Sequence, residues 1–457
     1  MRKRMLCGTL ATALVMTAAG CAADPLAQDR LPEKKEETPV QRSETYPELW
    51  QEDGSLFDDF TNGVNPEIWT VPDTKWGYDN RGVTSRNVSY TKDGILVLAA
   101  NGDLYKGDIM GMSDGGQPAT TGTRTGAIVR SHYYFGPGSY EVKMKVMPRF
   151  GGCSAIWTFF NDGSRNHEID IELPGPSKYS FDYAGMTNYI TEEKMDSVKT
   201  KTIANNDGEW HTYRFDWHTD PADPRIDYYI DGEKLVTSRR NIPTVKGYFT
   251  IGVWFPKGWA GVADFERNYM YVDWFRFTPY DETGWEANPR ENLEFDMEGL
   301  EHTYPSQTSP LPVNNFFANG SFEDGLEGWT AEGEAAASTE HATDGKGSAA
   351  IGKGGSLAQL VSGISTKVKY TLTVNTKNST KKTDAVLEVE YTDAFGNSLL
   401  EKSVVTEKLE NTGTWQHTLP LTPPSQAKKV RVTLRNNGGG TLWVDEAVLV
   451  PAGPAEG

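Results

Sequence analysis

Acidic and apolar residues alternate without a break over residues 166–173, which read Asn-His-Glu-Ile-Asp-Ile-Glu-Leu. Side chains of a β-strand point alternately to its two faces. If this run is a strand, Glu168, Asp170 and Glu172 share one face, and the apolar residues between them pack beneath it. Three carboxylates then stand in one row, with neighbouring Cα positions about 6.7 Å apart.

Such a row is electrostatically unfavourable, because like charges disfavour one another's ionised form and draw protons onto some members. Retaining glycosidases need this arrangement: two carboxyl groups about 5–5.5 Å apart, one ionised as nucleophile and one protonated as acid. The central Asp170 would hydrogen-bond to the nucleophile and help to hold the two protonation states apart. From the segment alone, a solvated acidic strand face is the alternative.

Short alternating segments surround the acidic run from residue 51 to residue 280. Residues 94–99, 139–146 and 225–230 are examples, and turn signals such as Asp231-Gly232 separate them. No long helical pattern intervenes. The pattern therefore predicts an all-β domain of two packed sheets that carries the acidic run.

A linker and a second β-rich unit follow. Residues 281–312 lose the alternation and gather Pro, Ser, Thr, Asn and Glu, which is typical of a linker. Residues 313–451 again contain short strand patterns without an internal repeat. The second unit is predicted to be another β-sandwich.

The first 21 residues have the features of a signal peptide. Basic residues at positions 2–4 precede an apolar stretch, and the leader reaches Ala18-Ala19-Gly20-Cys21 without an acidic residue. Small residues directly before a cysteine resemble the bacterial lipobox, which implies cleavage before Cys21 and its lipidation; an ordinary secretory leader is the alternative. Residues 22–50 are charged and contain proline, which indicates a tether. We expect an extracytoplasmic protein, lipid-anchored to a bacterial membrane at the cell surface or on the periplasmic side.

Composition excludes several function classes. A formal net charge of −18 and a sequence pI of about 4.9 repel phosphate backbones, so nucleic acid is not an expected partner. Cys153 is the one cysteine beyond the leader and the anchor, so the mature chain forms no intrachain disulfide. No nearby His or second Cys activates Cys153, which predicts a buried apolar residue. We expect a monomer that uses no cofactor for catalysis.

The acidic run and its surroundings resemble glycoside hydrolase family 16, whose hallmark is Glu-x-Asp-x-Glu or a bulged form with one extra residue. The chain has the unbulged form. The resemblance covers residues 56–280, and its motifs come in the family's order: Tyr140-Glu141-Val142-Lys143-Met144-Lys145, Ser154-Ala155-Ile156-Trp157, Trp210-His211-Thr212-Tyr213, Ile230-Asp231-Gly232 and Val272-Asp273-Trp274. It implies a concave jelly-roll β-sandwich that cleaves internal β-linkages of a polysaccharide or long glycan with retention.

The resemblance also implies roles for single residues. Glu168 is the implied nucleophile, Asp170 the assisting carboxylate, and Glu172 the general acid and then base. Trp157, just before the acidic run, is implied to stack on a sugar, with a core position as the alternative. Glu141 and Lys143 match positions that reach sugar hydroxyls in the family. Trp254 and Trp259 are candidates for the substrate cleft, with core positions as the alternative. Lys143 stands where Arg is common in the family, so a compact ammonium group replaces the planar guanidinium group that can form two parallel hydrogen bonds.

The substrate prediction rests on the residues that flank the acidic run. Asn166-His167 replaces the Trp-Asp pair of lichenase-type members, and Leu173-Pro174-Gly175 follows the run. These features look more like family members that act on galactose-containing glycans, so β-galactosidic bonds are predicted. An endo-β-1,3- or β-1,3-1,4-glucanase is the alternative, and transglycosylation is a third possibility. An inactive surface glycan-binding lipoprotein is the alternative from another class, against which the intact carboxylates argue.

The second unit resembles carbohydrate-binding modules of the family 4 and 9 type through residues 319–329 and 442–446. The resemblance implies that Glu323 and Asp445 help to hold a structural calcium ion, since calcium prefers carboxylate and carbonyl oxygens. Surface carboxylates at strand ends are the alternative. Trp329 and Trp443 are predicted core residues, which leaves sugar binding by this unit open.

Overall fold

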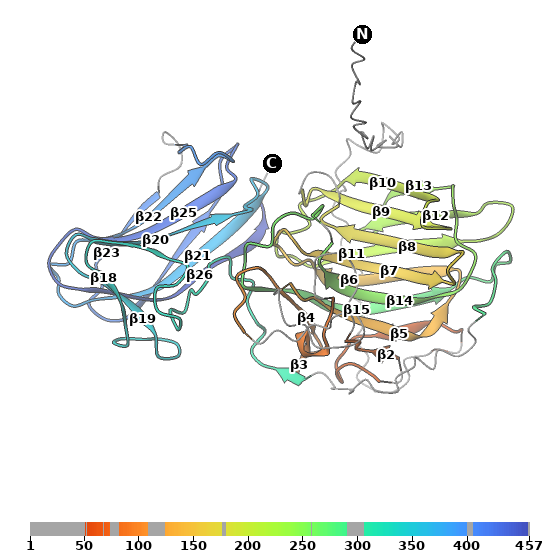
Figure 1. The fold of residues 1–457 in the computed structure, drawn as a ribbon, viewed down its shortest axis with the longest axis horizontal. Coiled ribbons are helices and arrows are strands. Elements are labelled where there is room, and N and C mark those ends of the chain that lie inside the picture. Colours follow the sequence, from red (N-terminus) through yellow and green to blue (C-terminus); the bar gives the residue numbers. More distant parts are fainter. Residues whose placement is uncertain are drawn as a thin grey trace, which may run out of the picture.

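A computed structural model describes residues 51, 53–66, 68–73, 82–107, 124–175, 180–256, 258–289, 306–399 and 405–455. The described chain forms two β-rich units that lie side by side (Figure 1), with one short 3-10 helix, η1 (Ser85–Asn87). No helix within these ranges is long and apolar enough to cross a membrane. The predicted all-β class is confirmed. The predicted leader, Cys21 and the tether lie outside the described residues.

The larger sheet of the first unit has nine strands in the order β13-β12-β11-β6-β15-β4-β3-β16, with β1 paired to β15. Neighbouring strands are antiparallel, except for the parallel pair of β16 and β3. The strands are β1 (Leu56–Asp58), β3 (Val88–Thr91), β4 (Leu96–Asn101), β6 (Gly138–Lys145), β11 (His211–His218), β12 (Arg225–Ile230), β13 (Glu233–Ser238), β15 (Arg267–Pro279) and β16 (Ser306–Thr308).

The second sheet of this unit has seven strands in the order β10-β9-β8-β7-β14-β5-β2, all antiparallel to their neighbours. The acidic run forms β8, near the middle of this sheet. The strands are β2 (Trp69–Thr70), β5 (Ala127–Phe135), β7 (Cys153–Asn161), β8 (Asn166–Leu173), β9 (Tyr183–Tyr189), β10 (Met195–Lys201) and β14 (Gly247–Trp254).

One apolar core fills the space between the two sheets. Ile169 and Ile171 of β8 enter it from the seven-stranded sheet, and Tyr140 and Val142 of β6 enter it from the other; all four are fully buried. Burial of Ile169, Ile171 and Val142 contributes about 1.5–3 kcal/mol for each side chain. Because strand side chains alternate, the intervening residues of each sheet face away from the core.

The second unit is a sandwich of two five-stranded sheets, as predicted. Their orders are β17-β20-β25-β22-β23 and β18-β19-β26-β21-β24. The strands are β17 (Thr330–Glu332), β18 (Ala335–Ser338), β19 (Ser348–Ile351), β20 (Gly355–Ser362), β21 (Val368–Asn378), β22 (Ala385–Thr392), β23 (Val405–Leu409), β24 (Trp415–Leu421), β25 (Lys429–Asn436) and β26 (Leu442–Pro454).

Direct contacts join the two units. The side chain of Asn314 bonds both main-chain groups of Tyr269, at 2.6 and 2.9 Å. The buried Arg149 donates from Nη1 to the carbonyl of Phe316 (3.1 Å) and from Nη2 to Asp264 Oδ1 (3.0 Å). Its guanidinium also lies 4.6 Å from the centroid of the Phe316 ring. Burial lowers the pKa of Arg149, and the Asp264 carboxylate opposes that shift.

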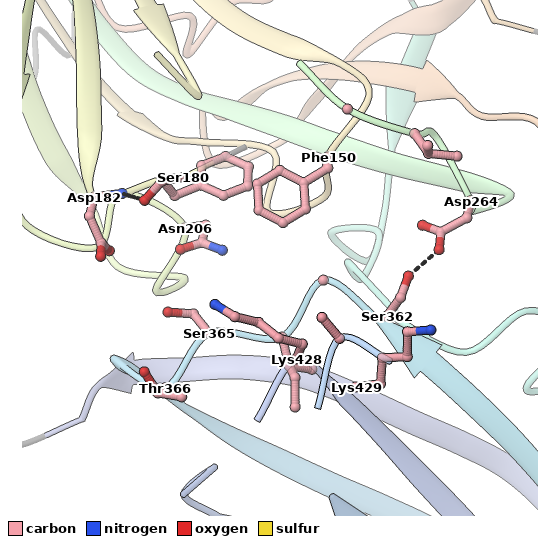
Figure 2. Close-up of a pocket in the computed structure, with 16 residues that line it drawn as sticks. Phe150, Ser180, Asp182, Asn206, Asp264, Ser362, Ser365, Thr366, Lys428 and Lys429 are labelled. Atoms are coloured by element: carbon pink, nitrogen blue, oxygen red, sulfur yellow. Dashed lines mark hydrogen bonds between the residues drawn. The ribbon is translucent and has the colours of Figure 1, made fainter. Parts of the chain in front are cut away.

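A cavity of about 480 Å³ opens at this junction (Figure 2). The first unit lines it with residues that include Phe150 and Asp182, and the second with residues that include Ser362 and Lys428. The Ser362 hydroxyl donates to the Asp264 carboxylate across the junction. The lining contains no carboxylate of the acidic run.

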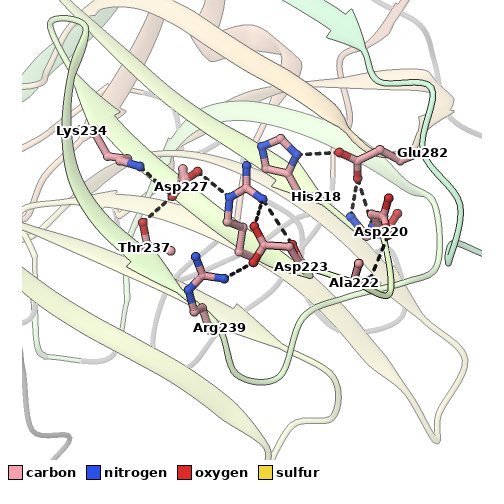
Figure 3. A network of polar contacts seen from close by, with 11 residues as sticks. His218, Asp220, Ala222, Asp223, Asp227, Lys234, Thr237, Arg239 and Glu282 are labelled. Atoms are coloured by element: carbon pink, nitrogen blue, oxygen red, sulfur yellow. Dashed lines mark hydrogen bonds and ion pairs between the residues drawn. The ribbon is translucent and has the colours of Figure 1, made fainter.

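A polar network fixes the chain where β11 ends and β15 leaves the nine-stranded sheet (Figure 3). The Glu282 carboxylate accepts from the Thr219 N–H at 2.7 Å and lies 2.6 Å from His218 Nδ1. Arg225 donates to both Asp223 and Asp227. Because these ion pairs lie near the surface, each contributes little, and the network mainly sets the geometry of the sheet edge.

Candidate active site

Strand β8 places three carboxylates on the outer face of the seven-stranded sheet. Ile169 and Ile171 are fully buried in the core, so Glu168, Asp170 and Glu172 point the other way. Strands β7 and β9 flank β8 on its two sides. The local alternation of the sequence thus becomes one acidic row in the middle of an outward-facing sheet surface.

Aromatic and apolar side chains border the acidic row. Trp157 of β7 is directly opposite Asp170, and opposed residues of antiparallel strands lie on the same face. Trp157 is 9% exposed and packs in a small apolar cluster outside the main core. Trp254 and Trp259 pack against this cluster, with their rings edge to face at 6.1 Å. The structure therefore brings all three predicted tryptophans to the side of the sheet that carries the carboxylates.

Burial raises the pKa of every carboxyl group in the row. It raises the pKa of Glu168 to about 7, and hydrogen bonds from Asn166 and Asp170 act in the opposite direction. Burial, then the charge of Glu168, raises the pKa of Glu172 to about 8. Asp170 is raised furthest, first by burial and then by the charges of its two neighbours. The hydrogen bond from Asn166 favours ionised Glu168, and the charge of Glu168 is among the causes that raise the pKa of its two neighbours.

Hydrogen bonds assign the proton positions within the row. Asn166 Nδ2 donates to Glu168 Oε2 at 2.8 Å, and Asn161 Nδ2 donates to Asn166 Oδ1 at 3.1 Å, which orients the amide. The bond between Asp170 and Glu168 favours the ionised form of Glu168 and the protonated form of Asp170. An ionised Glu168 beside a protonated Glu172 is the pairing that a retaining glycosidase requires.

Two polar residues on this face were missed by the sequence reasoning. Burial, followed by the charges of the acidic row, raises the pKa of Tyr189, so its hydroxyl stays protonated there. Arg130 of β5 lies opposite Thr250 of β14, which in turn lies opposite Trp157. The Arg130 guanidinium is 4.4 Å from the centroid of the Tyr248 ring. The alternation of residue types in β5 and β9 can be read from the sequence. The strand pairing that brings both strands to this sheet cannot.

The predicted substrate contacts of Glu141 and Lys143 are wrong. Both lie on β6 of the nine-stranded sheet, where Val142 between them enters the core. Their side chains therefore face outward on the opposite side of the sandwich from the acidic row. Arg276 Nη1 lies 3.5 Å from Glu141 Oε2, and Lys143 Nζ lies 3.8 Å from Asp273 Oδ2.

His167 and Cys153 lie beside the acidic row, and their contacts are structural. His167 Nδ1 accepts the backbone N–H groups of Thr244 (3.1 Å) and Val245 (3.0 Å). Burial lowers the pKa of His167 to about 4, so the ring is neutral near pH 7. Burial, then the charge of Glu172, raises the pKa of the fully buried Cys153 thiol. A protonated thiol is a poor nucleophile, as the sequence predicted for Cys153.

The carboxylates predicted to hold calcium contact one loop of the second unit. Glu323 Oε1 accepts from the Lys346 N–H at 2.6 Å, and Asp445 Oδ2 accepts from the Thr343 N–H at 2.6 Å. Among the described residues, no three His, Cys, Asp or Glu side chains gather as a metal site. The structural calcium ion stays a prediction without support from these contacts.

Both units match families of known proteins. The family model "Glycosyl hydrolases family 16" matches residues 80–276, and the model "Carbohydrate binding domain" matches residues 314–437. A beta-glucanase of Bacillus subtilis (strain 168) is 30% identical over 245 residues, which cover 50% of this chain and 88% of the relative. A beta-glucanase of Acetivibrio thermocellus is 30% identical over 204 residues, which cover 39% of this chain and 57% of the relative. A solved structure of Bacillus licheniformis beta-glucanase is 25% identical, with a TM-score of 0.40, over 50% of this chain and 100% of that one.

Proposed function

The chain belongs to glycosyl hydrolase family 16, and from this premise we propose that it is a retaining endo-β-glucanase whose catalytic pair is Glu168 and Glu172. The observation that carries the proposal is the geometry of the acidic row: β8 presents Glu168, Asp170 and Glu172 on one face, and Asn166 Nδ2 donates to Glu168 Oε2 at 2.8 Å. Burial raises the pKa of Glu168 and Glu172 alike, and the charge of Glu168 is a further cause of the raised pKa of Glu172. When Glu168 is ionised, Glu172 therefore tends to keep its proton.

The reaction would proceed in two displacements. In the first, a Glu168 oxygen bonds to the anomeric carbon while the glycosidic C–O bond breaks and Glu172 gives its proton to the departing oxygen. In the second, the Glu172 carboxylate takes a proton from water, and the water oxygen displaces Glu168 from the anomeric carbon. Asp170 donates a hydrogen bond to Glu168, which steadies the developing and departing carboxylate. Two inversions at one carbon give net retention.

The substrate proposal differs from the β-galactosidic prediction and takes its β-glucan alternative. Both curated relatives described above are beta-glucanases, and each is 30% identical to this chain. The partly exposed rings of Trp254 and Trp259 beside the row suit stacking against the C–H faces of pyranose units. Asn166 and His167 are explained by the hydrogen bonds they make, so their departure from the Trp-Asp pair does not require another substrate.

A substrate screen tests this function. Purified enzyme is incubated with mixed-linkage β-glucan, laminarin, agarose, carrageenan, keratan sulfate and mucin glycans, with Glu168→Gln as the matched inactive control. We expect short oligosaccharides from a β-glucan and none from the control, since loss of the nucleophile removes the covalent route. Faster cleavage of any galactose-containing glycan would restore the β-galactosidic alternative. No release from any of these glycans would favour the inactive glycan-binding lipoprotein.

We also propose that the second unit holds the enzyme on its polysaccharide and that a lipid on Cys21 anchors it to a bacterial membrane, at the cell surface or on the periplasmic side. The match of residues 314–437 to a carbohydrate-binding domain supports the first role. The leader, with small residues before Cys21, supports the second. Such an anchored enzyme would release oligosaccharides next to the membrane that carries it.

A further inference from the structure

A short loop of the first unit, between β10 and β11, is held between the two units. Its Ala204 packs in the hydrophobic core of the second unit, and the carbonyl of Asp207 accepts the N–H of Gly453 at 2.9 Å. Within the first unit, Asn205 Nδ2 donates to the carbonyl of Phe181 at 2.6 Å. Contacts with both units therefore fix the backbone of this loop.

Asn206 lies in the middle of the loop, and its side-chain oxygen has no hydrogen-bond partner among the described residues. The residue is 1% exposed, and Oδ1 is buried without a donor. Asn206 lines the cavity of about 480 Å³ at the junction, and Figure 2 shows its side chain facing the gap between the two units. A buried acceptor without a donor is unfavourable, and the fixed loop cannot turn it towards another group. Asn206 thus points to a ligand that supplies a donor.

The cavity has the size of a small-molecule site and an aromatic wall. Small-molecule sites enclose about 300–1,000 Å³, and the junction cavity falls within that range. The first unit lines it with the partly buried ring of Phe150, which lies 4.9 Å from the Phe181 ring between centroids. The second unit adds the hydroxyl residues Ser365 and Thr366 (Figure 2). The lining therefore offers both an apolar surface and hydrogen-bonding groups.

The charged groups of the lining suit a neutral ligand. Two carboxylates, Asp182 and Asp264, balance two ammonium groups, Lys428 and Lys429, so the lining has no net formal charge. A carboxylate or sulfate ion offers acceptors only and would leave Asn206 Oδ1 without a donor. A sugar hydroxyl both donates and accepts, and one primary amide can pair with two neighbouring hydroxyls. A neutral polyhydroxylated ligand therefore fits this lining better than a simple anion.

We propose that the junction cavity binds a glucan disaccharide, separate from the catalytic row. One sugar hydroxyl donates to Asn206 Oδ1, a neighbouring hydroxyl accepts from Nδ2, and C–H groups of the sugar contact the Phe150 ring. The choice of a glucan rests on the proposed function, whereas the choice of a sugar rests on the lining. The lining contains no carboxylate of the acidic row. Because both units line the cavity, the bound sugar bridges them.

Photoaffinity labelling of the full chain tests the proposal. Glu168→Gln is the parent, the probes are diazirine glycosides of cellobiose and laminaribiose, and mass spectrometry locates the labelled peptides. We expect labels on the catalytic face and also at the junction, within residues 180–182 or 362–366. Asn206→Ala should lower junction labelling about tenfold at low probe concentration, the effect of losing two neutral hydrogen bonds, and should leave the catalytic face unchanged. Asn437→Ala, at an exposed position outside the lining, is the matched control.

Thermal unfolding separates a binding role of Asn206 from a structural one. Because Asn206 Oδ1 makes no hydrogen bond within the described chain, Asn206→Ala should not lower the Tm of the parent without sugar. Cellobiose or laminaribiose should raise the Tm of the parent more than that of Asn206→Ala, since a bound sugar stabilises the folded state. A lower Tm without sugar, together with equal shifts by sugar, would assign Asn206 a structural role and overturn the site.

The labelling outcomes distinguish this site from the proposed function. Labels confined to the catalytic face, or equal junction labelling in the parent and Asn206→Ala, overturn the site even where the enzyme cleaves β-glucan. Junction labelling by a lactose probe and by neither glucan probe overturns the glucan assignment and leaves a sugar site. An active chain that cleaves no β-glucan, with junction labelling that still depends on Asn206, overturns the proposed function and leaves the site.

Discussion

Replacing Asn166 with alanine should move the acidic limb of the pH–activity profile. Asn166 Nδ2 donates to Glu168 Oε2 at 2.8 Å, and this bond favours the ionised carboxylate. A hydrogen bond to a charged group contributes about 1.5–3 kcal/mol, and the lower end suits a site that water partly reaches. Since 1.36 kcal/mol corresponds to one pKa unit, the pKa of Glu168 should rise by about one unit.

The consequence for activity follows from the sign of that shift. The nucleophile acts only when ionised, so the acidic limb, near pH 7 in the wild type, should move about one unit towards higher pH. The alkaline limb reports Glu172, near pH 8, and should stay in place. The two limbs approach each other, so kcat/KM should fall about tenfold at pH 6 and less near the optimum.

The assay is kcat/KM on the best glucan between pH 5 and 10, because this ratio reports the free enzyme. Asn161→Ala is the matched control: it removes the bond that orients the Asn166 amide but leaves the amide donor, so it should give a smaller shift in the same direction. An acidic limb that stays where it is in Asn166→Ala, with normal melting, would refute the assignment of the limb to Glu168.

Three further predictions address the acid, the junction and the anchor. Glu172→Ala should lower kcat/KM on polymer about 10²- to 10⁴-fold, but much less on a dinitrophenyl glucoside oligomer, whose leaving group needs no proton; equal losses on both would exclude Glu172 as the acid. Arg149→Met leaves the Phe316 carbonyl without its buried donor, so it should cost about 2 kcal/mol and lower the first calorimetric transition by about 5 °C. Lys428→Met, in the lining of the junction cavity, should not. Cys21→Ser should abolish labelling by radioactive palmitate in a bacterial host and release the protein from membranes; unchanged labelling would contradict the anchor.

Local pattern was enough to predict the acidic row, because the alternation in a strand depends only on the residues within it. The same reasoning predicted two β-sandwiches and the core positions of Ile169 and Ile171. It failed for Glu141 and Lys143. Their alternation also described a real strand, but strand pairing is set by contacts far apart in the sequence, and β6 joined the sheet opposite β8.

The same limit explains the residues that sequence reasoning missed or misplaced. Tyr189 and Arg130 come to the acidic face through the order β9-β8-β7-β14-β5, which no local motif contains. Trp443 was expected in the core because large rings in β-proteins mostly pack there. Its neighbours Leu442 and Val444 show that the alternation alone would have placed it outside, so the pattern was a better guide than the residue type.

The central claim is that Glu168 attacks the anomeric carbon and forms a covalent intermediate. The most direct test is mass spectrometry of the enzyme after incubation with a 2-deoxy-2-fluoro glucan glycoside, which slows the second displacement. We predict a mass increase of one glycosyl group per chain, carried after proteolysis by the peptide with residues 166–173 and located on Glu168. No adduct together with turnover to the inverted anomer, or an adduct on any other residue, would contradict the account.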